Sequence, residues 1–152
     1  MTLNTNRSQD DVMVKMSPRL KEFCDKQELM RLAYFDGDGY PRVVPLWFVI
    51  RDNDYFLGTG ATSPKAKALQ RNARAGWVID GGEDRRYLGV SFTGHAEEVS
   101  DAELRATIYE ALGVKYFGSS DHEKFVEVYG KVDDPATAYY RLKPEGGRSW
   151  EY

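Results

Sequence analysis

Stretches of alternating or continuous apolar residues recur along this chain at the spacing of β-strands, and they predict a sheet that dominates the fold. The six predicted strands are MRLAYF at 30–35, PRVVPLWFVI at 41–50, YFLGT at 55–59, AGWVID at 75–80, YLGVSFTGHAEEV at 87–99 and TAYYRL at 137–142. Turn sequences separate several of them, namely DGDG at 36–39, Asp52-Asn53-Asp54 and GGED at 81–84. Gly89 and Gly94 predict bends in the fifth strand, so we expect a small barrel rather than a flat sandwich.

Two Ser-Pro pairs predict helix starts, at Ser17-Pro18 and at Ser63-Pro64. A serine hydroxyl there can accept a hydrogen bond from a free backbone N–H, and proline already has the φ angle of a helix. The first helix is expected to reach about Gln27 and the second about Asn72.

Two further helices are predicted between the fifth and sixth strands. Ser100 and Glu103 match a capping box, followed by an apolar stripe and by Gly113 as a C-terminal cap. A short helix is expected over 121–129. We expect both helices to cover one opening of the barrel.

The second predicted strand has an unusual composition. Val43 to Ile50 is apolar almost without alternation, which predicts burial on both faces, while Pro45 cannot donate to a ladder and predicts an edge, a bulge or a barrel rim. Backbone groups freed from pairing there could bind a planar ligand. A buried strand with an edge proline is the simpler alternative.

Length and charge limit the classes of function. The 152 residues suit a single domain at 17–152, preceded by a flexible tail at 1–16 that shows no periodicity. With 21 basic and 24 acidic residues and no dense basic run, the chain is not expected to bind nucleic acid. No apolar run is long enough for a membrane span or a signal peptide, so we expect a cytoplasmic protein with no membrane partner.

Few residues suggest metal or acid–base chemistry. Cys24 is the only cysteine, which excludes an internal disulfide, and His95 and His122 do not complete a metal-ligand spacing with it. Cys24 is interpreted as a core thiol and His95 as a surface or interface residue. No catalytic acid or base is identified, so the catalytic residues stay unknown.

The segment after the third strand suggests an anion site. Lys65 and Lys67 fall in the first turn after Ser63, although a helix N-terminus already carries a partial positive charge. Free N–H groups, a hydroxyl and two ammonium groups there would bind a phosphate, with Thr59 between two glycines that allow close approach. Two solvated lysines are the alternative.

Several motifs, in this order, resemble the pyridoxamine 5′-phosphate oxidase-like family of flavin-binding split barrels, which includes deazaflavin-dependent reductases. The resemblance covers roughly residue 17 to the C-terminus. The motifs are the hairpin DGDGYPRVVPLWFV, YFLGT followed by Ser63-Pro64-Lys65, Leu69 and Asn72 in the same helix, GHAEEV at 94–99, and RLKP with SW within 141–150.

The resemblance implies a six-stranded antiparallel split β-barrel with flanking helices, forming a homodimer with FMN or a related deazaflavin between its subunits. By analogy one strand would face the isoalloxazine ring, through Arg42, Val44, Pro45, Leu46 and Trp47. The phosphate would be held by Thr59, Ser63, Lys65 and Lys67. Trp150, with Arg148, would reach the partner's site.

Two departures from the family bear on the substrate. The oxidase proper continues beyond the closing strand with a basic segment that grips the substrate phosphate, whereas this sequence stops at Tyr152, and it has a lysine where Trp47 stands here. Both differences favour a flatter, less anionic substrate than pyridoxamine phosphate.

The function that the resemblance implies is therefore an FMN-dependent oxidoreductase that transfers a hydride through flavin N5 to or from a small planar substrate. A deazaflavin-dependent reductase is an alternative, with additional cations near Lys67, Arg71 or Arg85-Arg86 for the more anionic tail. A flavin or haem carrier without enzymatic activity on the same scaffold is another.

Overall fold

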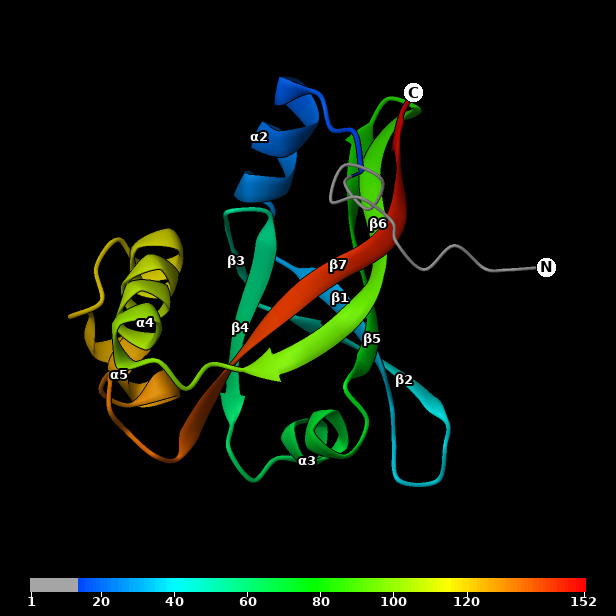
Figure 1. Cartoon of the computed structure of the whole chain (residues 1–152). Coiled ribbons are helices and arrows are strands. Elements are labelled where there is room, and N and C mark those ends of the chain that lie inside the picture. The colour runs from blue at the N-terminus through cyan, green and yellow to red at the C-terminus, as the bar shows by residue number, and fades with distance from the viewer. Residues whose placement is uncertain (1–13) are drawn as a thin grey trace.

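Seven strands form one antiparallel sheet in the computed structural model, which describes residues 14–152 (Figure 1). The order across the sheet is β2-β1-β5-β6-β7-β4-β3, and β2 and β3 are its two edges. The strands are β1 (Met30–Phe35), β2 (Pro41–Leu46), β3 (Val49–Arg51), β4 (Asp54–Gly60), β5 (Arg74–Glu83), β6 (Arg86–Glu98) and β7 (Thr137–Glu151). The sheet coils without closing, so the predicted split barrel is confirmed, with one strand more than expected.

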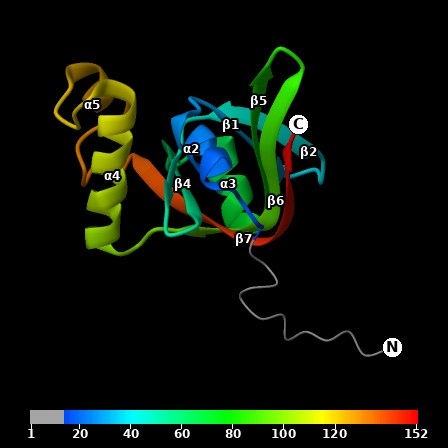
Figure 2. The same ribbon diagram turned by 90° about the horizontal axis from the view of Figure 1, so that it is seen from above.

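Four helices flank the barrel: α2 (Pro18–Lys26), α3 (Pro64–Arg71), α4 (Ala102–Phe117) and α5 (Glu123–Tyr129). α2 and α3 lie at opposite ends of the barrel, and the view from above shows both within the ring of strands (Figures 1 and 2). α4 and α5 lie beside the barrel, where α4 contacts β3 and α5 contacts β4. The expectation that these two helices cover an opening is therefore wrong.

Two apolar clusters explain this arrangement. The first cluster fills the barrel and includes Leu20 of α2 and Leu69 of α3, while the second lies between the outer face of the sheet and α4 and α5. β4 contributes to both, because Leu57 points into the first cluster and its neighbour Phe56 into the second. Because β4 has apolar residues on both of its faces, both faces have to be covered, and α4 and α5 cover the outer face.

The predicted strand at 41–50 is broken at Trp47 and Phe48 into β2 and β3. β2 pairs only with β1, so the edge position expected for Pro45 is confirmed. Burial on both faces is wrong for this strand, since Val43 is 65% exposed.

Helix caps were predicted correctly where serine precedes proline. Ser17 Oγ accepts a hydrogen bond from Leu20 N at 3.0 Å, and α3 starts in the same way at Ser63. α4 differs from the prediction at both ends. Its N-cap is Asp101 rather than Ser100, and the helix runs through Gly113 to end at Gly118, which has a φ of +78°.

The tail predicted at 1–16 lies outside the described residues except for its last three. Of these, Val14 and Met16 pack against the first cluster, and the backbone oxygen of Lys15 accepts a hydrogen bond from Ser149 Oγ at 2.9 Å. This short stretch is therefore attached to the barrel.

Candidate functional site

The start of α3 brings several predicted ligand-binding residues together. Thr59 lies near the end of β4, and its Oγ1 is 3.2 Å from Ser63 Oγ. Ser63 Oγ in turn accepts a hydrogen bond from Ala66 N at 3.1 Å, so the serine caps the helix. Pro64 takes the first helical position, where no N–H is needed. Two hydroxyl groups and the positive end of a helix dipole thus meet at one point.

The two lysines of this turn differ in their surroundings. Lys65 is partly buried, and burial is the one cause that lowers its pKa. Lys67 is exposed. Within residues 14–152 neither lysine forms an ion pair, and the first turn of α3 contains no acidic residue. A desolvated ammonium group without a counter-ion, at the positive end of a helix, is a suitable partner for a bound anion.

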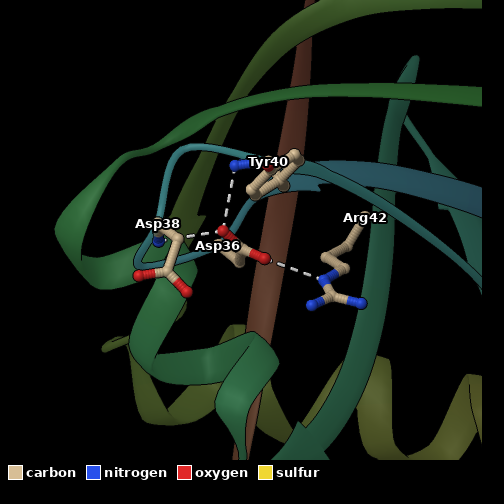
Figure 3. A network of polar contacts seen from close by, with 4 residues as sticks. All are labelled: Asp36, Asp38, Tyr40 and Arg42. Atoms are coloured by element: carbon tan, nitrogen blue, oxygen red, sulfur yellow. Dashed lines mark hydrogen bonds and ion pairs between the residues drawn. The ribbon is translucent and has the colours of Figure 1, made fainter.

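Arg42 belongs to a polar network in the β1–β2 hairpin (Figure 3). One carboxylate oxygen of Asp36 accepts hydrogen bonds from the N–H groups of Asp38 and Tyr40, both at 2.9 Å. The other accepts from Arg42 Nε at 2.8 Å. The hydrogen bond from Arg42 is the main reason that the pKa of Asp36 is lowered, and the same bond raises the pKa of Arg42.

This network fixes the direction of the Arg42 side chain while using only its Nε. The two terminal nitrogens make no hydrogen bond with residues 14–152. The hairpin also lies next to α3, since a Cβ placed on Gly37 would be 3.4 Å from Arg71 Nη2. The end of β4 thus lies at the start of α3, and the hairpin that contains Arg42 lies at its last residue, Arg71.

The residues of β2 that were predicted to face a ring point in two directions. Leu46 is buried in the first cluster, and Val44 packs against the same cluster. Val43 and Pro45 are exposed on the opposite face. A ligand beside β2 would therefore contact its backbone together with Val43 and Pro45.

Trp47 lies where β2 has ended, and its indole packs into the second cluster. Its ring stacks on Tyr116 of α4 with 4.6 Å between centroids and 13° between planes. Phe117 meets the same indole edge-on at 5.6 Å. Trp47 is only partly buried, so one part of it remains accessible.

Trp150 is separate from the cluster at α3. It lies on β7 opposite Gly89 of β6, and its ring covers that glycine so closely that a Cβ there would clash. Arg148 is exposed on the same strand. The structure thus holds Trp150 against its own chain, and a role for it in a partner's site stays a prediction.

Cys24 and His95, to which the sequence analysis gave no catalytic role, lie outside the cluster at α3. Cys24 is fully buried in the first cluster, and burial raises the pKa of its thiol to about 12. His95 Nδ1 pairs with the carboxylate of Glu145 at the surface. Within the described part of the chain no three His, Cys, Asp or Glu side chains are grouped as metal ligands. None of the helices described could cross a bilayer.

Sequence reasoning missed three side chains next to these residues, namely Asp36, Lys115 and Tyr116. Asp36 lies in a turn motif that gave no reason to connect it with Arg42. Lys115 and Tyr116 contact residue 48 from a helix far along the chain. A local sequence pattern contains no signal for such contacts.

Comparison with known proteins identifies relatives of this fold. The family model described as pyridoxamine 5′-phosphate oxidase matches residues 16–151. A search of proteins with curated functions found no match.

The solved structures that resemble this fold belong to proteins with different descriptions. A conserved hypothetical protein from Mycobacterium tuberculosis is 25% identical, with a TM-score of 0.75 over 96% of this chain and 90% of its own. The haem storage protein HutZ from Vibrio cholerae is 23% identical, with a TM-score of 0.70 over 91% and 95%. An FAD-binding protein from Mesorhizobium loti is 21% identical, with a TM-score of 0.64 over 88% and 93%.

Proposed function

The chain belongs to the pyridoxamine 5′-phosphate oxidase family, and on that basis we propose that it is a homodimeric FMN-dependent oxidoreductase whose substrate is small and planar. The observation that supports this most is Lys65, an ammonium group that is partly buried without a carboxylate partner among residues 14–152. A flavin phosphate would be its counter-ion. When bound, FMN would supply hydride transfer at its N5 atom.

The phosphate end of the cofactor would be held by the start of α3. The hydroxyls of Thr59 and Ser63 and the backbone N–H of Lys65 would bind its oxygens, since Ala66 N already donates to Ser63 Oγ and Lys67 N to the backbone oxygen of Ser63. Lys65 would neutralise part of its charge, and Lys67 would contribute a more distant, solvent-screened attraction. Arg42 would serve the ring end instead, because its hairpin meets α3 at the last residue, Arg71. Its two terminal nitrogens would be available there, since Asp36 already holds Nε.

The ring end would lie against the exposed edge of the sheet. β2 offers the backbone of an unpaired edge together with the apolar surfaces of Val43 and Pro45. These groups would exclude water from one side of the ring and orient it, and Trp47 would border the same edge. Trp150 of the partner subunit is proposed to complete the site. A planar substrate fits this setting better than a charged one, because the groups expected at the ring are mostly apolar.

The nearest alternatives differ in the cofactor. A deazaflavin with a longer anionic tail would need further cations, for which Lys67 and Arg71 on α3 are the nearest candidates. Arg71 already packs under the β1–β2 turn, which favours FMN. A haem carrier is a third candidate, because HutZ shares the fold.

One set of measurements on the purified protein distinguishes these functions. Its visible absorption spectrum is recorded, the protein is denatured, and any released compound is identified by its mass. Protein without a bound compound is titrated with FMN, a deazaflavin coenzyme and haemin, and its mass in solution is measured by light scattering. FMN release or tight FMN binding by a dimer supports the proposal, whereas tight binding of only haemin or only the deazaflavin contradicts it.

A further inference from the structure

The break between β2 and β3 leaves a peptide that no neighbouring strand pairs with. Phe48 belongs to neither the β1–β2 ladder, which ends at Leu46, nor the β3–β4 ladder, which begins at Val49. Its side chain is fully buried in the first cluster. A buried residue whose backbone N–H and C=O are both unpaired would destabilise the fold, so other partners are needed.

Two consecutive residues of α4 provide those partners. Tyr116 Oη accepts a hydrogen bond from Phe48 N at 2.9 Å and donates to the backbone oxygen of Glu28 at 2.8 Å. Lys115 Nζ donates to the backbone oxygen of Phe48 at 3.0 Å. The last turns of α4 thus bind both backbone polar groups of one residue, Phe48, just beyond the end of β2.

The same tyrosine also fixes the residue before the break. Its ring stacks on the Trp47 indole, while its hydroxyl binds the Phe48 peptide. Trp47 therefore points into the second cluster and Phe48 into the first, and Tyr116 sets the point at which the chain changes direction. Burial raises the pKa of Tyr116 to about 12, so the hydroxyl keeps its proton over the working range of pH.

α4 is itself held firmly at its other end. Arg105 Nη2 donates to the backbone oxygens of Asp134 at 2.8 Å and Thr137 at 3.0 Å, and Tyr109 Oη donates to that of Gly130 at 2.9 Å. The helix is thus anchored to the loop before β7, and its opposite end can act as a fixed support for the break.

We propose that Tyr116, assisted by Lys115, is a positioning residue for the flavin ring: it fixes the Trp47–Phe48 break and so places the end of β2 and the Trp47 indole beside the ring. This inference rests on the proposed function. It adds to the site α4, a helix far along the chain from both the start of α3 and β2.

The test compares Tyr116→Phe with Tyr109→Phe. Each variant loses one hydroxyl that bonds to the backbone, and both tyrosines belong to the same helix and the same apolar cluster. Of the two tyrosines, only Tyr116 contacts the break. Thermal unfolding is measured for both, together with FMN affinity, the absorption spectrum of bound FMN and its reduction potential.

Tyr116→Phe leaves the Phe48 N–H without an acceptor, so FMN affinity should fall about tenfold and the bound spectrum should shift. Tyr109→Phe should lose less thermal stability, because its hydroxyl makes a single hydrogen bond, and should change FMN affinity by less than about twofold. If Tyr116→Phe unfolds too readily, Lys115→Met replaces it and should weaken FMN binding about threefold with a smaller spectral shift.

The outcomes separate this inference from the function on which it rests. If the wild-type protein does not bind FMN, the proposed function is wrong and the positioning role is wrong with it. If the wild type binds FMN and Tyr116→Phe and Lys115→Met match it in affinity, spectrum and potential, only the positioning role is refuted. A shift in the spectrum and potential confined to Tyr116→Phe and Lys115→Met confirms it.

Discussion

Replacing Lys65 with methionine tests the proposed phosphate site most directly. Methionine keeps an apolar side chain of similar length and removes the charge. A hydrogen bond from a charged group contributes about 1.5–3 kcal/mol, which corresponds to about a 10- to 150-fold loss of FMN affinity. Lys65→Glu, which places a negative charge beside the phosphate, should abolish binding.

The same substitution should leave the unliganded protein at least as stable. Burial lowers the pKa of Lys65, so the folded chain carries this ammonium group at a cost in free energy. Removing the charge removes that cost. We expect the thermal midpoint of Lys65→Met without ligand to equal or exceed that of the wild type.

Riboflavin provides the matched control ligand, because it has the same ring as FMN and no phosphate. FMN and riboflavin are titrated into wild type, Lys65→Met and Lys67→Met while flavin fluorescence is followed. Lys65→Met should lose affinity for FMN and not for riboflavin. Lys67→Met should lose less than about threefold, because an exposed charge is screened by salt.

The pH dependence of FMN affinity provides an independent test of the role of Lys65. Bound phosphate should raise the lowered pKa of Lys65, so wild-type affinity for FMN should fall as the pH rises through the range where Lys65 of the free protein deprotonates. Lys65→Met should lack this dependence. An equal loss of FMN and riboflavin affinity in Lys65→Met, or no loss of either, would refute the assignment of the phosphate site.

Three further outcomes follow from the structure. Cys24 should resist alkylation at pH 8 in the native protein and react once the chain is unfolded, as mass analysis would show, because the thiol is buried with a pKa near 12. Gly89→Ala should displace the Trp150 ring and lower stability by about 1–3 kcal/mol, measured by thermal unfolding and tryptophan emission; unchanged values would contradict the contact. Burial lowers the pKa of Lys115 to about 8, below that of an unfolded lysine, so the unfolded chain binds more protons above pH 8. The wild-type free energy of unfolding should therefore rise relative to Lys115→Met by up to about 2 kcal/mol between about pH 8 and 10, and parallel curves from denaturant titrations would show that reasoning to be wrong.

Local signals in the sequence were sufficient for much of the fold. Ser17 and Ser63 cap their helices as predicted, because the hydroxyl and the N–H that it binds are three residues apart. The bend expected at Gly94 is confirmed by a register shift between Thr93 and Gly94. Gly94 is opposite Pro144, and this irregular pairing lets a proline lie within a strand. β7 therefore runs on to Glu151, beyond the predicted end of the sixth strand at Leu142.

Two boundaries were wrong because neighbouring residues could fill the same role. Ser100 and Asp101 are both good N-caps, and the structure uses the second. GGED at 81–84 was predicted as a turn because of its glycines, yet the chain reverses at Asp84 and Arg85, with φ angles of +51° and +65°. Both residues adopt positive φ without glycine, in the pattern of a two-residue hairpin turn.

The candidate site also has one part that local sequence signals predicted and one part that they did not. Its phosphate end is contained in nine consecutive residues from Thr59 to Lys67, so turn, cap and charge could be read together from the sequence. Its ring end depends on which face of β2 points inward, on the pairing of Asp36 with Arg42 and on a tyrosine 68 residues from the peptide that it binds. Sequence periodicity could not predict these features, because one residue of register exchanges the faces of a strand and a distant side chain decides where the strand ends. Substitutions at the phosphate end should therefore change affinity for FMN over riboflavin, and substitutions at the ring end should change the spectrum and potential of either flavin.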